Sequence, residues 1–213
     1  MGRDSAPFSR ISTSTVPPDL AVANGHIALP AYTAAPSEGS LFWAPYAQRN
    51  QLFANDGTGR FSDRSEYDDA FCGRPEVWRG LACADIDGDG ALDLLATCVG
   101  GRTRLFRNVA PRRGHWLLVK AVDPRHGGRL AYGAEVTVEI GPRRWIGWIN
   151  AASSYLCSSD PRAHFGLGSA ERVDAIRVRW PDGDDETFPP VRTDQQITLV
   201  KGKGRPSVPA RPR

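Results

Sequence analysis

Four aspartates recur at short intervals in one segment of the chain, Asp85-Ile86-Asp87-Gly88-Asp89-Gly90-Ala91-Leu92-Asp93, called the acidic loop below. They occupy positions one, three, five and nine, and the backbone carbonyl at position seven adds a fifth oxygen. A flexible cage of about six to eight oxygen ligands suits Ca²⁺ better than Mg²⁺, and softer metals call for His or Cys ligands. The acidic loop therefore predicts a calcium site. The predicted ligands are Asp85, Asp87, Asp89, the carbonyl of Ala91, and Asp93.

The alternative is that the acidic loop is a solvent-exposed Asp/Gly turn that binds nothing. Two like charges about 4 Å apart repel by roughly 4 kcal/mol at an effective dielectric of about 20, so several converging carboxylates favour a cation among them. Gly88 and Gly90 permit the left-handed backbone values that turn a chain around an ion. The loop is not an EF-hand, because its twelfth position is Ala96 rather than Glu and a buried strand follows it. We therefore expect the ion to clamp a β-hairpin and to be structural.

Sequence motifs of catalysis are absent. There is no Gly-x-Ser-x-Gly elbow, no His-Glu-x-x-His and no phosphate-binding or dinucleotide-binding glycine motif. The four histidines are scattered, and His164, beside Phe165, is interpreted as structural. The six tryptophans are interpreted as core and rim residues, since Trp145 and Trp148 would lie on opposite faces of a strand. The sequence predicts that the protein is not an enzyme.

Composition and charge exclude several further classes. Of the 213 residues, 40% are apolar and 24% charged, and no run approaches the roughly 18 apolar residues of a transmembrane helix. The N-terminus has no apolar stretch of the kind found in secretory signals. Residues 201–213 carry five basic residues and no acidic one, so the net charge of +3 becomes −2 for the rest. We therefore expect a disordered, basic, Pro-rich tail over 201–213, and nucleic-acid binding through it is only the weaker alternative.

The cysteine pattern leaves two interpretations open. Four cysteines allow three fully paired connectivities, and no Cys-x-x-Cys pair suggests a zinc ribbon or a redox site. Cys83 and Cys98 flank the acidic loop on what should be neighbouring strands. A disulfide between them and buried free thiols both fit the sequence.

Short alternating apolar runs predict an all-β chain. The runs 134–140 and 175–180 each place apolar side chains on one face and charged ones on the other, whereas 115–122 is apolar on both faces and is predicted to be a central strand. Asn55 to Gly59 has the turn chemistry of a tight hairpin. The acidic cluster at 181–186 lacks regular ligand spacing and is interpreted as a solvated turn.

The chain also divides into segments. No apolar pattern continues through 111–114, which predicts a domain boundary there. Prolines break residues 1–48 into pieces too short for a core of their own, and only 20–23 is strand-like. The expected organisation is an incomplete blade or irregular lead-in over 1–48, a blade with the calcium loop over 49–110, a second domain over 115–200, and the tail.

The pattern Asp-x-Asp-x-Asp-Gly-x-x-Asp-Leu between two strands resembles the FG-GAP/VCBS repeat, the blade unit of integrin-α-type β-propellers. Arg49 to Phe61 resembles the outer strands of one blade. Its Leu-Phe-x-Asn element recurs about fifty residues later in Arg104-Leu105-Phe106-Arg107-Asn108. The acidic loop between them falls where the family places it.

Residues 115–200 resemble the ASPIC/UnbV domain through a series of ordered matches. These matches include His115-Trp116-Leu117-Leu118-Val119, Tyr132-Gly133-Ala134-Glu135-Val136, Ser154-Tyr155-Leu156, His164-Phe165-Gly166-Leu167-Gly168, Val178-Arg179-Trp180-Pro181-Asp182-Gly183 and Asp194-Gln195-Gln196-Ile197-Thr198. Asn24-Gly25-His26 also resembles the family's usual entry to its last blades. The arrangement is similar to the C-terminal part of the cartilage acidic protein family.

The resemblance implies a partial β-propeller of one to two blades followed by a β-sandwich-like ASPIC/UnbV domain. It also implies an extracellular, periplasmic or cell-surface location and a binding or adhesion role, with an unknown protein or carbohydrate ligand. The alternatives are an accessory component of an enzyme or biosynthetic system and, more weakly, nucleic-acid binding through the basic tail. Family members carry more calcium-loop blades upstream, usually behind an export signal. A closed propeller needs about four to eight blades, so we expect a fragment, a split gene product or a chain completed by a partner.

Overall fold

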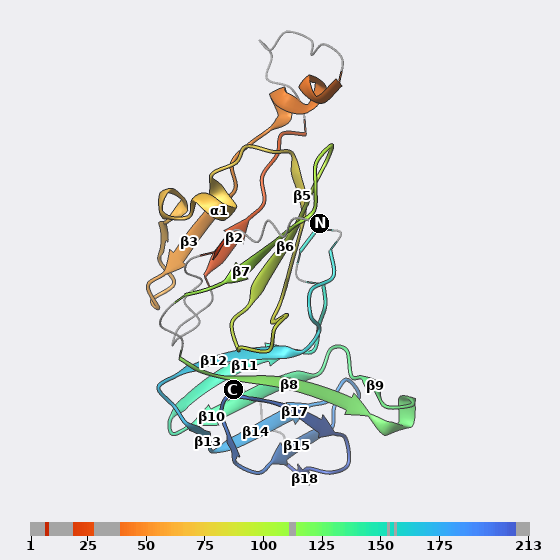
Figure 1. Cartoon of the computed structure of the whole chain (residues 1–213). Helices are drawn as coiled ribbons and strands as arrows, with labels where there is room; N and C mark the ends of the chain where they lie inside the picture. The colour runs from red at the N-terminus through yellow and green to blue at the C-terminus, as the bar shows by residue number, and fades with distance from the viewer. Residues whose placement is uncertain are drawn as a thin grey trace. The chain divides into compact units, whose positions relative to one another are not determined.

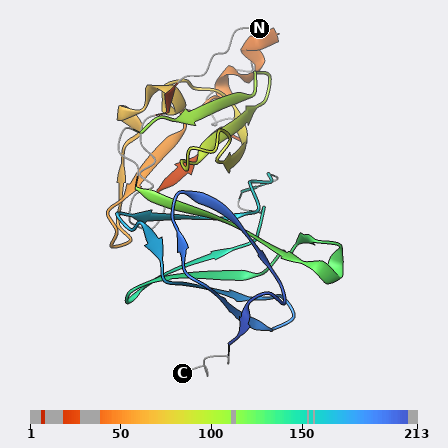
Figure 2. The same ribbon diagram turned by 60° about the horizontal axis from the view of Figure 1, so that its bottom comes forward.

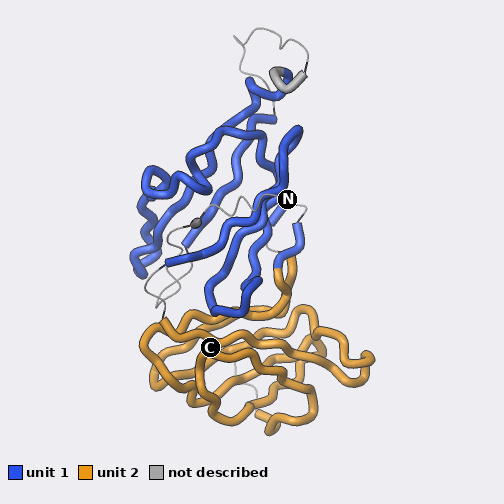
Figure 3. Tube along the Cα trace, in the orientation of Figure 1, with its two compact units in different colours: residues 1–113, 153–159 blue, residues 114–152, 160–213 orange. Residues whose placement is uncertain are grey.

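The computed structural model describes residues 7–8, 19–27, 39–110, 114–152, 154–155 and 157–207 (Figure 1). It divides into two compact units, coloured blue and orange in Figure 3. The first unit comprises 1–113 together with 153–159, and the second comprises 114–152 and 160–213. Residues 153–159, which the sequence assigns to the second domain, thus group with the first unit. There the hydroxyl oxygen of Ser159 accepts a hydrogen bond from the backbone N–H of Cys83 (3.1 Å).

The described residues of the first unit form two small sheets. One has the strand order β1 (Pro7–Phe8), β7 (Arg104–Asn108), β6 (Asp93–Cys98), β5 (Trp78–Ala84), with β1 and β7 parallel. The other has the order β2 (Leu20–Val22), β3 (Gln51–Asn55), β4 (Phe61–Asp63), all antiparallel. In the part of this unit that the structure describes, three short helical segments accompany the sheets, η1 (Gly39–Tyr46), η2 (Ser65–Tyr67) and α1 (Asp69–Cys72).

Aromatic side chains form the centre of the first unit's core. Phe106 packs edge-on against Phe71, with ring centroids 5.3 Å apart, and lies 6.2 Å from the ring of Trp78. All three are buried, together with Leu52 and Leu94. This core joins both sheets to α1, which sequence periodicity did not predict because its four residues are too short to show a helical repeat.

Two local predictions in the first unit are confirmed. β3 and β4 form the hairpin expected at Asn55 to Gly59, and both Gly57 and Gly59 adopt positive φ. The strand expected at 20–23 is β2, which pairs with β3. Most of the remaining lead-in, including Pro17, Pro18, Pro30 and Pro36, lies outside the described residues, as do residues 111–113 of the boundary predicted at 111–114.

The second unit is built from two larger sheets and a short ribbon. The five-stranded sheet has the order β11 (Arg143–Trp148), β10 (Glu135–Ile140), β14 (Ala175–Arg179), β15 (Asp185–Phe188), β18 (Arg205–Pro206). The other has the order β12 (Ala163–Gly168), β8 (His115–Asp123), β17 (Gln195–Val200), with β9 (Arg129–Leu130) also on β8. The ribbon pairs β13 (Arg172–Val173) with β16 (Val191–Arg192), and η3 (Pro124–His126) follows β8.

One apolar cluster draws residues from both larger sheets, so the sheets pack against each other. Val136 and Val138 of β10 and Ile176 of β14 point into it, while Arg177 faces solvent, as their alternation predicted. β8 lies between β12 and β17, which confirms it as a central strand, and it pairs in parallel with β17 (Figure 2, green and dark blue). The prediction of an all-β chain is confirmed in part, because the described residues are mostly β-strand but include the helix α1 and short 3-10 segments.

Lys201 to Ser207, which the sequence assigns to a disordered tail, are part of the second unit. β18 pairs with β15, and the buried carboxylate of Glu186 accepts the N–H groups of Gly202 (2.8 Å) and Gly204 (2.9 Å). The ammonium of Lys201 contacts Asp182 and lies 5.9 Å from the ring centre of Trp180. These long-range contacts hold residues 201–207 in the second unit, so the prediction of disorder is wrong for this segment. Residues 208–213 lie outside the described residues.

Asp182→Asn is expected to lower the melting temperature at neutral pH. The difference in melting temperature between the wild type and the variant should become smaller in acid. Hydrogen bonds from Arg125 and Lys201 hold the pKa of Asp182 well below its usual value. A carboxyl group whose folded pKa is depressed stabilises the fold above its unfolded pKa of about 3.9, and this contribution is lost as the pH falls through the folded pKa. Thermal unfolding of both proteins from about pH 2 to 7 measures the effect. A difference that is constant over this range would contradict the assignment.

Candidate metal site

β5 and β6 form an antiparallel hairpin whose turn is the acidic loop. The register pairs Ala84 with Asp93 and Cys83 with Leu94, so the loop connects the two strands directly. Gly88 (φ 75°) and Gly90 (φ 87°) adopt the left-handed backbone values expected of them. The position of the loop between two neighbouring strands is confirmed.

Three of the predicted ligands converge at this turn. One carboxylate oxygen from each of Asp85, Asp87 and Asp89 lies within 4.8 Å of the other two. Asp85 is buried, Asp89 is half-buried and Asp87 is exposed, so the group is open to solvent on one side. Hard oxygen donors in this arrangement fit a hard cation such as Ca²⁺. The cluster could therefore hold a metal ion.

The loop's own backbone positions two of these carboxylates. Asp85 accepts hydrogen bonds from three N–H groups, those of Gly88 (2.8 Å), Asp89 (3.1 Å) and Gly90 (3.0 Å). Asp89 accepts one from the N–H of Ala91 (2.9 Å). These bonds fix the direction of both side chains before any ion is bound.

Asp93, the fourth predicted carboxylate ligand, is bound in another way. It is 2% exposed, and its two oxygens accept the N–H groups of Ile86 (3.2 Å) and Asn108 (2.8 Å). Burial raises its pKa, and the charges of Asp89 and Asp85 add to the effect. Asp93 thus ties the acidic loop to β7 and is not in the converging group. Its role as a ligand, like that of the Ala91 carbonyl, stays a prediction.

Sequence reasoning missed a cation beside the cluster. Arg107 extends from β7 and forms an ion pair with Asp87. Its position in the Leu-Phe-x-Asn element, one residue before Asn108, was visible in the sequence. Only the pairing of β7 with β6 brings that position next to the acidic loop.

The cysteines next to the acidic loop are free thiols, as are Cys72 and Cys157. Cys83 pairs with Leu94 and Cys98 pairs with Trp78, so Cys83 and Cys98 lie at opposite ends of the hairpin. The register therefore excludes the disulfide between them and leaves the free-thiol interpretation.

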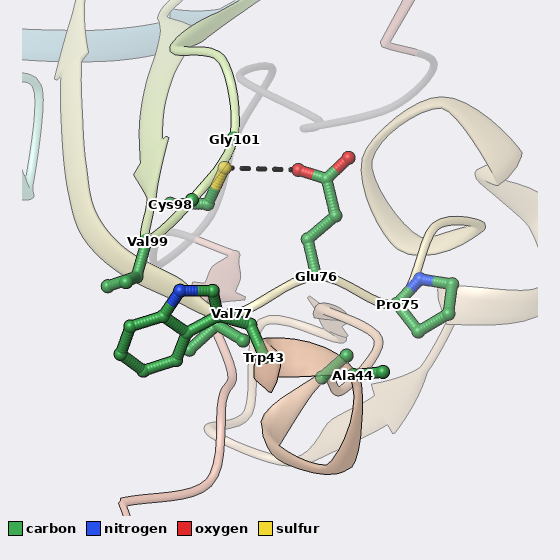
Figure 4. Close-up of a pocket in the computed structure, with 10 residues that line it drawn as sticks. Trp43, Ala44, Pro75, Glu76, Val77, Cys98, Val99 and Gly101 are labelled. Carbon is green, nitrogen blue, oxygen red and sulfur yellow. Dashed lines mark hydrogen bonds between the residues drawn. The ribbon is translucent and has the colours of Figure 1, made fainter. Parts of the chain in front are cut away.

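A cavity of about 450 Å³ lies elsewhere in the first unit, between η1 and the β6–β7 turn. Figure 4 shows Trp43, Glu76 and Cys98 around it. The carboxylate of Glu76 accepts the Cys98 thiol proton (3.1 Å) and pairs with Arg104 (2.7 Å). Burial, helped by Glu76, raises the pKa of Cys98 to about 11. At neutral pH the Cys98 thiol is therefore protonated and a poor nucleophile.

Comparison with known families agrees with this geometry. Residues 41–96 match the FG-GAP-like repeat, and residues 124–206 match the ASPIC and UnbV family. The chain thus contains an FG-GAP-like repeat followed by an ASPIC and UnbV domain, as the sequence indicated. The acidic cluster lies within the FG-GAP-like match, which implies a propeller blade.

Over 110 residues the chain is similar to cartilage acidic protein 1, with 36% identity to the protein of Xenopus tropicalis and 37% to that of Homo sapiens. The similar region makes up 49% of this chain but only 16% of each relative's length. These families are usually non-catalytic. Among the described residues, no helix is long and apolar enough to cross a membrane.

Proposed function

We propose that the chain is a non-enzymatic, calcium-stabilised β module that serves extracellular or cell-surface binding within a larger propeller. The observation that carries this proposal is the convergence of Asp85, Asp87 and Asp89 at the turn of the β5–β6 hairpin. β5, β6 and β7 of the sheet that contains this hairpin are antiparallel, as the strands of a propeller blade are, and β1 adds a fourth strand in parallel. The two larger sheets of the second unit, which share one apolar cluster, support a sandwich-like ASPIC/UnbV domain.

The residues of the acidic loop define what a bound ion would do. Asp85, Asp87 and Asp89 would hold Ca²⁺, with the Ala91 carbonyl and Asp93 as the remaining predicted ligands. The ion supplies positive charge that offsets the repulsion among the carboxylates. Asp93 already joins the acidic loop to Asn108 of β7. A cation in the acidic loop would therefore stabilise the three neighbouring strands β5, β6 and β7. The role is structural, and the ligand-binding groups would be loops presented by the rigid sheets.

The test is thermal unfolding of the full chain in calcium and in excess chelator, with Asp87→Ala as the matched variant. A ligand that binds only the folded state stabilises it by about 2.7 kcal/mol at a hundredfold excess over its Kd. We expect calcium to raise the melting temperature of the wild type, magnesium to do so less, and the variant to lose the response. Equal melting temperatures of the wild type with and without calcium would overturn the proposal.

The binding partner follows from the same proposal. We infer a protein or carbohydrate ligand outside the cell, because rigid β scaffolds present variable loops for such recognition. Calcium sites of extracellular modules have Kd values of about 10⁻⁴ to 10⁻³ M. A Kd in this range would fit the proposed location, whereas a much tighter site would weigh against it.

A further inference from the structure

The three converging carboxylates differ in what holds them. Backbone N–H groups of the acidic loop hold Asp85 and Asp89. Asp87 is instead paired with a full positive charge, the guanidinium of Arg107, which comes from a different strand. The cluster therefore has a cation of its own at its exposed side.

The pairing of β7 with β6 places the guanidinium of Arg107 next to the acidic loop. Asn108, the next residue, donates its backbone N–H to Asp93 at the end of the acidic loop (2.8 Å). Leu94 pairs with Phe106 on the other side of Arg107. The backbone on both sides of Arg107 is thus fixed to the hairpin. Its side chain is 48% exposed, so the guanidinium can leave Asp87 for water without disturbing the core.

Arg107 and a divalent cation compete for the same carboxylate. Arginine is effectively always charged in proteins, so it offsets the repulsion among the carboxylates when no ion is bound. The same charge repels an incoming cation, because both would have to lie within a few ångströms of Asp87. A bound ion and a paired Arg107 therefore exclude each other in part.

We propose that Arg107 is a tethered counter-ion of the acidic loop, which holds Asp87 in the empty site and is displaced when calcium binds. This inference rests on the proposed function and adds regulation to that site. Arg107 keeps the hairpin turn folded at low calcium and lowers the calcium affinity. Such a residue would shift the site toward the weak affinities of extracellular modules.

The experiment is a calcium titration of the full chain by calorimetry, combined with melting temperatures in chelator, for the wild type and Arg107→Gln. The variant is expected to bind calcium about tenfold more tightly, which corresponds to about 1.4 kcal/mol, and to melt at a lower temperature in chelator. Arg104→Gln is the matched control, because Arg104 lies on the same strand but pairs with Glu76. It is expected to leave the calcium Kd unchanged.

A second variant, Arg107→Lys, is needed in case Arg107→Gln does not fold without calcium. Arg107→Lys keeps the charge and is expected to hold the calcium Kd within about threefold of the wild type. If the wild type binds calcium and Arg107→Gln binds it no more tightly, the counter-ion inference is overturned while the proposed function stands. If neither protein binds calcium, the proposed function fails, and this inference fails with it.

Discussion

Asp85→Ala is expected to abolish the calcium-dependent rise in melting temperature and to lower the melting temperature in chelator as well. Asp85 is buried and accepts hydrogen bonds from three backbone N–H groups of the acidic loop. Hydrogen bonds to charged groups contribute about 1.5–3 kcal/mol each and are not additive. We expect a loss of roughly 3 kcal/mol in chelator, which at about 2–4 °C per kcal/mol is a fall of about 6–12 °C.

The matched control is Asp87→Asn. In the wild type the Asp87 carboxylate is exposed and is paired with the side chain of Arg107. The variant is expected to lose most of the calcium response while changing the melting temperature in chelator far less. Scanning calorimetry of the wild type and both variants, each with calcium and with chelator, separates the two roles. If both variants behaved alike in chelator, the three backbone hydrogen bonds of Asp85 would not be what organises the empty loop.

Phe106→Ala is expected to destabilise the first unit by about 3–5 kcal/mol, the range for removal of a large buried aromatic side chain. Phe106 is 1% exposed and contacts the rings of Phe71 and Trp78, so its loss leaves a cavity between the two sheets. The calcium affinity should fall too, because Phe106 anchors the strand that carries Asn108 to Asp93. Urea unfolding with and without calcium measures both effects.

Leu105→Ala is the control for this prediction. Leu105 is the neighbouring residue on β7 and is only half-buried, so its truncation should cost much less than that of Phe106. Phe106→Leu should recover part of the loss by refilling some of the cavity. Equal effects of Phe106→Ala and Leu105→Ala would show that the aromatic cluster is not the main source of the unit's stability.

The acidic loop was predictable because its information is local. The spacing of the aspartates, the two glycines and the flanking strands all lie within consecutive residues, so neither the hairpin nor the convergence of Asp85, Asp87 and Asp89 needs a distant contact. The family resemblance was also visible in consecutive residues, and both family matches confirm it. The alternation of Val136, Val138 and Ile176 also placed the core face of the second unit correctly.

For the repeated Leu-Phe element, local sequence does not predict which of the two side chains is buried. The two copies read alike in sequence, yet Leu52 is buried and Phe53 half-buried in β3, whereas Leu105 is half-buried and Phe106 buried in β7. A shift of one residue moves every side chain of a strand to the other face. Which face is buried depends on the neighbouring strands, and these differ between the two sheets.

Other features depend on pairings between distant residues and were not predictable. Arg107 reaches Asp87 only through the register of β7 with β6. Glu186 holds the N–H groups of Gly202 and Gly204 from another strand, which gives a fixed place to residues that composition alone assigned to a tail. The cavity beside Trp43 forms between a helical segment with no apolar repeat and a turn far along the chain.

The grouping of residues 153–159 with the first unit affects how the protein can be divided. The polypeptide passes between its two units three times, after residues 113, 152 and 159. One protease cut after residue 113 would leave only residues 153–159 of the first unit covalently joined to the second. A fragment ending at residue 113 would lack the Ser159 hydroxyl oxygen that accepts the backbone N–H of Cys83. The two compact units are therefore interleaved along the sequence, although the two family matches follow one another. A chimaera that replaces one unit with that of a relative would therefore have to take residues 153–159 from the same protein as residues 1–113.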